Sequence, residues 1–71
     1  MFIKIQNSTF NINDISYVAP HPVSSHLLIV QMISDPDHPH RFNYSSKAEA
    51  AEAANKATEQ ILKMVALYGK R

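Results

Sequence analysis

The chain has 71 residues and contains no cysteine, no tryptophan and a single glycine. Without cysteine it can form neither disulfides nor thiolate metal sites, which are common supports of small secreted domains. With one glycine it has no glycine-rich phosphate-binding loop. No apolar run reaches the roughly 20 residues that cross a bilayer, and no basic and apolar leader segment is recognisable. These absences predict a cytoplasmic protein that has no membrane partner.

The length and net charge of the chain limit the number of domains and the type of partner. Seventy-one residues predict one domain, residues 1–71, with a sheet in 1–45 and a helix in 46–69. A chain this short buries only about 60% of the surface that its unfolded form exposes, so association is a natural source of extra stability. The net charge of +1 indicates no preference for a strongly charged partner.

Alternating apolar and polar residues predict strands before position 45. The apolar phase slips at Asn13 and Asp14, which predicts a bend or bulge within one strand. Pro20 and Pro22 exclude a central strand over residues 19–25, because proline lacks the N–H that a strand donates. The predicted strands are residues 2–6, 10–18, 26–34 and 40–44.

The second half of the chain predicts one long helix. Ser46 and Glu49 have the spacing of a capping box, and Gly69 stands where a helix often ends. The 22 residues from 47 to 68 contain no glycine or proline and are rich in alanine. Two glutamate–lysine pairs, Glu52–Lys56 and Glu59–Lys63, have the i,i+4 spacing that favours ion pairs.

These elements predict an α+β fold. We expect an antiparallel meander of three or four strands with the long C-terminal helix packed on one face. The predicted core combines the apolar strand residues with the apolar stripe of the helix. Its members are Ile3, Ile5, Phe10, Ile12, Ile15, Ile29, Phe42, Tyr44, Ala50, Ala54, Ala57, Ile61, Val65 and Tyr68.

The segment 27–33 is apolar on both faces of its predicted strand, which is unusual for a one-sided antiparallel sheet. Its odd-numbered apolar residues point one way and its even-numbered apolar residues the other. One helix covers only one sheet face, so we expect a partner to cover part of the other. The residues assigned to this partner-binding surface are Leu28, Val30, Met32, Phe2 and Lys4. The sequence leaves open whether the opposite face of the strand is the exposed one, and whether residues 20–25 and the helix end cover both faces within the chain.

Acidic and histidine side chains are concentrated between positions 35 and 40. Asp35, Asp37, His38 and His40 could together ligate a transition metal. However, the sequence Asp-Pro-Asp-His-Pro is also typical of a turn, because aspartate and proline favour turn geometry. We interpret the segment as a turn and assign no metal ligand.

Catalytic motifs are missing from the sequence. The serines at 24, 25, 45 and 46 lie in no recognised nucleophile motif. A domain of this size also has difficulty enclosing a pocket of the usual 300 Å³ or more. We therefore expect a non-enzymatic protein and assign neither catalytic nor cofactor-binding residues.

The sequence thus favours a small protein–protein interaction or regulatory module that acts through its sheet face or edge. The expected partner is a second copy, giving a homodimer, or a larger protein. The alternative is a single-stranded nucleic-acid-binding protein, in which aromatic and basic residues on the open sheet bind bases and phosphates. The residues assigned to this alternative are Lys4, Tyr17, Arg41 and Lys47.

Overall fold

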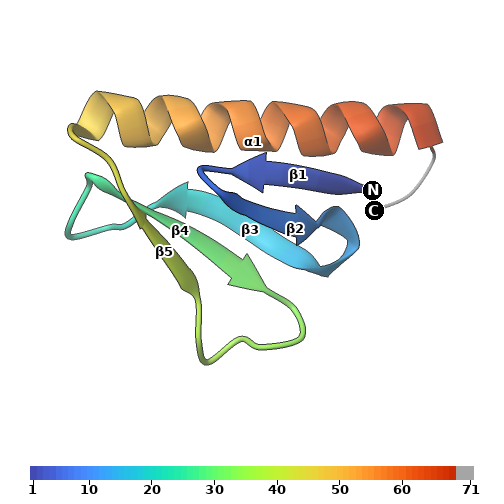
Figure 1. Ribbon diagram of the computed structural model, residues 1–71, viewed down its shortest axis with the longest axis horizontal. Coiled ribbons are helices and arrows are strands. Elements are labelled where there is room, and N and C mark those ends of the chain that lie inside the picture. The colour runs from blue at the N-terminus through green and yellow to red at the C-terminus, as the bar shows by residue number, and fades with distance from the viewer. Residues whose placement is uncertain (69–71) are drawn as a thin grey trace.

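The computed structural model describes residues 1–68, except for the side chain of Tyr68 (Figure 1). It contains five strands, one short 3-10 turn (Ile12–Asp14) and one α-helix. All strand pairs are antiparallel, and they form a two-stranded sheet, β1-β2, and a three-stranded sheet, β3-β4-β5. The predicted α+β fold with a C-terminal helix packed on antiparallel strands is confirmed. The elements are β1 (Phe2–Ile5), β2 (Ser8–Asn11), β3 (Ile15–Pro20), β4 (Leu27–Met32), β5 (His40–Asn43) and α1 (Lys47–Tyr68).

The β1-β2 hairpin is closed by a two-residue turn, Gln6-Asn7, between the paired residues Ile5 and Ser8. Gln6 has φ 52°, a region that favours glycine in such turns. Its side-chain Nε2 donates a hydrogen bond to the Asn43 carbonyl at 2.8 Å. This bond fastens the turn of the first sheet to β5 of the second.

The two sheets separate at Ile12–Asp14, so the expectation of one strand over residues 10–18 is wrong. The Asn11 side chain accepts a hydrogen bond from the Asn13 N–H at 3.0 Å and starts the 3-10 turn. Ile12 and Ile15 are both fully buried, three positions apart. That spacing suits a helical turn and not a strand, in which residues three apart point to opposite faces. The predicted break at Asn13-Asp14 is therefore a change of sheet.

In the three-stranded sheet, β4 lies between β3 and β5. Pro20 ends β3, an edge strand, where a missing N–H is tolerated. The connection from β3 to β4 is organised by His21, whose Nδ1 accepts hydrogen bonds from the N–H groups of Val23 and Ser24 at 3.1 and 3.0 Å. The irregular connection predicted over residues 19–25 therefore begins only after Pro20, because Ala19 and Pro20 still pair with β4, and its start is ordered by the hydrogen bonds to His21.

α1 begins at Lys47, as the capping sequence predicts, because Ser46 Oγ accepts a hydrogen bond from the Glu49 N–H at 3.2 Å. The second half of the predicted capping box differs, since the Glu49 carboxylate accepts from Ser45 Oγ at 2.8 Å. Gly69, the predicted end of the helix, lies outside the described residues. Neither predicted glutamate–lysine pair is within ion-pair distance in the described part of the chain.

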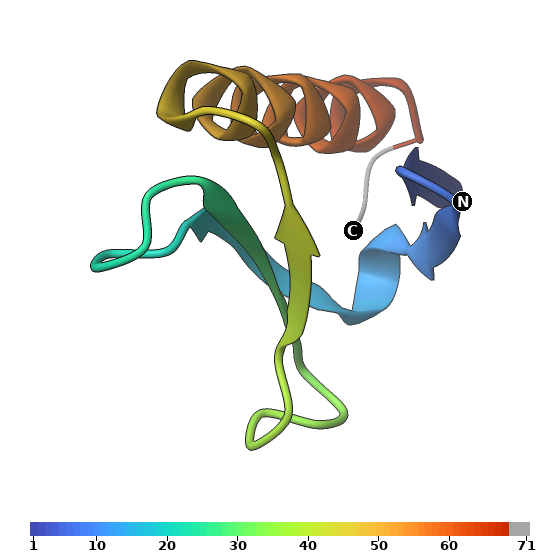
Figure 2. The same ribbon diagram turned by 60° about the vertical axis from the view of Figure 1, so that its left-hand side comes forward.

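The core lies where both sheets meet α1. Figure 2 shows the sheets diverging below the helix, which spans the opening between them. Three buried alanines, Ala50, Ala54 and Ala57, let the first half of α1 approach the strands closely. Of the predicted core, Phe42, Tyr44 and Val65 are only partly buried, and the Tyr68 side chain lies outside the described residues. The other members are buried: Ile3, Ile5, Phe10, Ile12, Ile15, Ile29, Ala50, Ala54, Ala57 and Ile61.

Candidate functional site

The even-numbered residues of β4, expected to bind a partner, are instead part of the core. Leu28 and Val30 are fully buried, and Met32 is 8% exposed. They belong to the same cluster as Ala54, Ala57 and Ile61 of α1. The helix therefore covers this face of β4, and the assignment of Leu28, Val30 and Met32 to an exposed surface is wrong.

The opposite side of the three-stranded sheet faces away from α1. Side chains alternate along a strand, so the partners of Leu27 and Ile29 share this side with them. We call this surface the open sheet face. It consists of Tyr17, Ala19, Leu27, Ile29, Gln31, Arg41 and Asn43.

The open sheet face has an apolar centre and a polar margin. Ile29 lies opposite Ala19 on one side and Arg41 on the other. It is only 7% exposed although it lies outside the core cluster, because side chains of both neighbouring strands flank it. Tyr17 is 51% exposed, and none of the seven residues is acidic.

The sequence contains a signal that distinguishes the two faces of β4. Gln31 is the one polar residue between positions 27 and 33, and it shares its face with Leu27 and Ile29. A polar residue on one face of an otherwise apolar strand indicates that this face meets solvent. This signal identifies the even-numbered face as the buried one.

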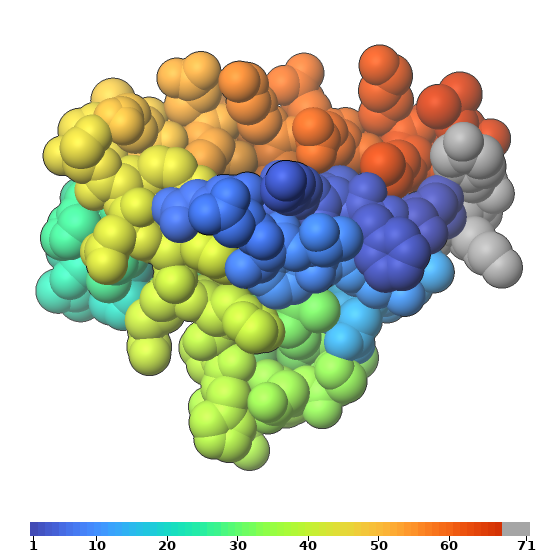
Figure 3. Space-filling model, viewed as in Figure 1, coloured from blue at the N-terminus to red at the C-terminus, as the bar shows by residue number. Residues whose placement is uncertain are grey.

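Phe2 and Lys4, the other residues assigned to the partner-binding surface, are both exposed on β1. They lie on the two-stranded sheet and line a trough between β1 and α1. The trough consists of two adjoining hollows of about 190 and 390 Å³, which share Lys4 and Gln60. Figure 3 shows this side of the molecule, with β1 in dark blue below the orange of α1.

The helix wall of this trough comes from one stripe of α1. Lys56, Gln60, Lys63 and Leu67 follow one another at intervals of four, three and four residues, so they share one helix face. In the sequence, Lys56 and Lys63 each follow a glutamate by four residues, which suggests that both are paired with glutamates. That interpretation draws attention away from the stripe that the two lysines form with Gln60 and Leu67. Helical spacing alone is the signal that could have found it.

The residues assigned to nucleic-acid binding do not form one surface. Tyr17 and Arg41 share the open sheet face. Lys4 lies in the trough, and Lys47 is exposed at the start of α1. Two of the four residues therefore share a face, on the two strands that flank β4.

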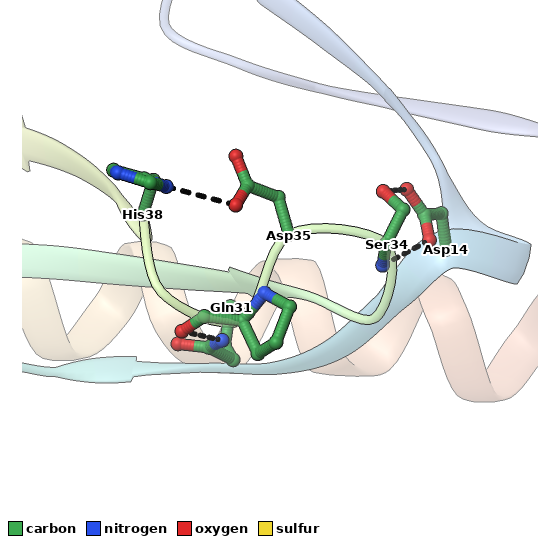
Figure 4. Close-up of polar contacts among 6 residues, drawn as sticks. Asp14, Gln31, Ser34, Asp35 and His38 are labelled. Atoms are coloured by element: carbon green, nitrogen blue, oxygen red, sulfur yellow. Dashed lines mark hydrogen bonds and ion pairs between the residues drawn. The ribbon is translucent and has the colours of Figure 1, made fainter.

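The turn between β4 and β5 holds the acidic and histidine residues. His38 Nδ1 lies 2.9 Å from Asp35 Oδ1, and Ser34 is bonded through its N–H and its hydroxyl to the Asp14 carboxylate at 2.9 and 2.5 Å (Figure 4). The His40 ring instead packs edge-on against Phe10, with centroids 5.1 Å apart. Within residues 1–68 no three histidine, aspartate or glutamate side chains are grouped to hold a metal ion. These contacts order a turn.

No helix in the described part of the chain is both long and apolar enough to cross a membrane. Comparisons with protein-family models, with curated proteins and with solved structures found no match.

Proposed function

We propose that the protein is a non-enzymatic interaction module that associates with a second copy of itself, or with a larger protein, through the open sheet face. The single observation that supports this is the apolar centre of the face, formed by Ala19, Leu27 and Ile29 beside the half-exposed ring of Tyr17. An antiparallel sheet that meets only solvent on one side carries mainly polar residues there. On this face Tyr17 is exposed, Ala19 and Leu27 are partly exposed, and Ile29 is buried between them. An exposed aromatic ring beside partly exposed aliphatic side chains is a feature of interaction surfaces.

The size of the face indicates how strong such an association would be. β4 has six residues, and with about 3.3 Å per residue and strands about 4.8 Å apart the face measures roughly 20 by 14 Å. This is well below the roughly 800 Å² per partner that stable complexes bury. We therefore expect weak and reversible self-association, with a Kd in the range of about 10 µM or above.

Sedimentation velocity over a range of protein concentrations tests this proposal. We expect the weight-average mass to rise with concentration, and the variant Leu27→Lys to stay monomeric over the same range. A matched control is Val23→Lys, which makes the same kind of change at an 86% exposed position in the β3–β4 connection. Tyr17→Ala serves as a second variant, and circular dichroism checks that each variant is folded. A concentration-independent monomer that also exposes little apolar surface to a dye would contradict the proposal.

Single-stranded nucleic acid is the second candidate ligand of this face. Its support is that Tyr17 and Arg41 share a face without a carboxylate, which suits base stacking beside a phosphate contact. Fluorescence anisotropy with labelled single-stranded DNA at about 50 mM salt tests it, because phosphate contacts are strongest at low salt. Binding that Arg41→Ala weakens would favour this candidate. No signal at about 50 µM protein would exclude it, because contacts with phosphates give measurable affinity under these conditions.

A further inference from the structure

Three lysines line the trough between β1 and α1, while the glutamates nearest to them line the adjoining hollows on the helix. Lys4 comes from β1, and Lys56 and Lys63 come from α1. None of the residues that line the two hollows is acidic. Within residues 1–68 no carboxylate is within ion-pair distance of any of the three lysines, although Glu52 and Glu59 stand at the right spacing on the helix. These ammonium groups are therefore available to an anionic ligand.

The end of the trough away from Tyr44 is apolar. Phe2 is 60% exposed and Leu67 is 69% exposed, and both line the larger hollow together with the partly buried Met64. Single exposed apolar residues are common on protein surfaces, but a group of them around one hollow indicates a binding site. The trough thus offers an apolar pocket at one end and lysines along its length.

We propose that the trough binds an extended, carboxylate-rich segment of a partner protein that carries one apolar anchor side chain. The anchor lies in the hollow between Phe2 and Leu67, and the acidic side chains of the segment contact the three lysines. Charge complementarity supports this partner, because the lining carries only cations and neutral groups. The proposal does not depend on the open sheet face, whose residues are not among those that line the trough.

The same features favour a peptide over single-stranded nucleic acid. A nucleic-acid groove holds exposed aromatic rings along its length, on which successive bases stack. Here Phe2 is the exposed ring at one end, and Tyr44 at the other end is partly buried. The groups beside Phe2 are the aliphatic chain of Leu67 and the thioether of Met64, which suit an apolar side chain.

Titration of the ¹⁵N-labelled full chain with a designed peptide tests the proposal. The probe is a fluorescein-labelled twelve-residue peptide of glutamate and aspartate with one central leucine, and its companion has serine in place of leucine. At low salt we expect the probe to shift the amide signals of Lys4, Gln60 and Lys63, and the serine companion to bind several-fold more weakly. Binding should weaken as salt rises, because exposed charges are screened over about 10 Å at 0.1 M salt.

Charge reversals identify the site. Lys63→Glu should lower the affinity for the probe peptide by about tenfold, because it removes one charge attraction and adds one charge repulsion. Lys4→Glu should act in the same direction from the other wall of the trough. Lys47→Glu is the matched control, because it makes the same charge change at an exposed site that does not line either hollow. We expect it to change the affinity by less than twofold.

Several outcomes would overturn the proposal. Equal losses for Lys63→Glu and Lys47→Glu would mean that the peptide responds only to net charge. Equal binding of the serine companion would show that the site holds no apolar anchor. A single-stranded DNA twelve-mer that binds more tightly than the peptide and shifts the same trough signals would identify the trough as a nucleic-acid site. Trough signals that shift with protein concentration alone would assign the trough to a second copy. Shifts confined to the open sheet face would place the peptide there.

Discussion

Leu27 and Leu28 are adjacent in the sequence, but they lie on opposite faces of β4. Leu28 is fully buried in the core, whereas Leu27 is only partly buried on the open sheet face. Replacing each in turn by alanine therefore makes the same chemical change in two environments. We expect Leu28→Ala to destabilise the fold strongly and Leu27→Ala to do so weakly.

The size of the difference follows from burial. Leu28→Ala removes three buried carbons at about 0.8 kcal/mol each, and the cavity left behind raises the cost to about 3–4 kcal/mol. The whole fold of 71 residues is expected to be stable by only about 4–11 kcal/mol. For Leu27→Ala, which loses partly exposed surface and leaves no closed cavity, we expect about 1 kcal/mol or less.

Urea denaturation followed by circular dichroism measures both values. With a urea dependence of about 1 kcal/mol per molar for a small domain, Leu28→Ala should lower the midpoint by about 3 M. Leu27→Ala should lower it by about 1 M or less and should also reduce self-association. Equal midpoint shifts for the two variants would refute the assignment of the two faces of β4.

Three further predictions concern the helix and the turns. Ala57→Leu should destabilise the fold by about 1–3 kcal/mol through overpacking under α1, and an unchanged melting temperature would refute this; Ala48→Leu on the exposed side of the helix is the control. Ser46→Ala should cost about 1 kcal/mol in urea denaturation because the Glu49 N–H loses its cap, and no change in the midpoint would contradict the cap. Asp14→Ala should speed hydrogen exchange at the Ser34 amide, which loses its carboxylate acceptor; an unchanged exchange rate would show that this bond does not protect the turn.

The helix could be predicted from the sequence almost completely, because its signals are local. The cap at Ser46 and the alanine-rich segment without glycine or proline set its start and length. The spacing of Ala50, Ala54 and Ala57 also predicted which side of α1 packs on the strands. None of these signals depends on residues far away in the chain.

The division into two sheets could not be predicted, because it depends on contacts between distant residues. Ile12 continues the apolar alternation of β2, and only its burial beside Ile15 in a shared core shows that the chain turns between them. The sequence around Asn13 indicates a break but not whether the strand resumes in the same sheet. Sheet membership follows from pairing with β4, which begins 12 positions after Ile15.

The candidate surfaces were predicted in part. The exposure of Phe2 and Lys4 follows from their alternation with the buried Ile3 and Ile5. The assignment of the exposed face of β4 is wrong because it rests on the apolar residues of both faces and gives no weight to Gln31, the polar residue that marks the odd-numbered face as the one that meets solvent. The lysine stripe of α1 was hidden by the expected ion pairs, whose formation depends on side-chain rotamers as well as on spacing.

The first strand of the chain is sheltered by its last element. Ile3 and Ile5 belong to the same cluster as Ala57 and Ile61, more than 50 positions later. During synthesis, the early strands emerge before the residues that exclude water from them exist. The strands can therefore be sheltered only after residues 57–61 have been made, and a ribosome-bound fragment that ends before position 50 would keep its apolar strands open to other chains.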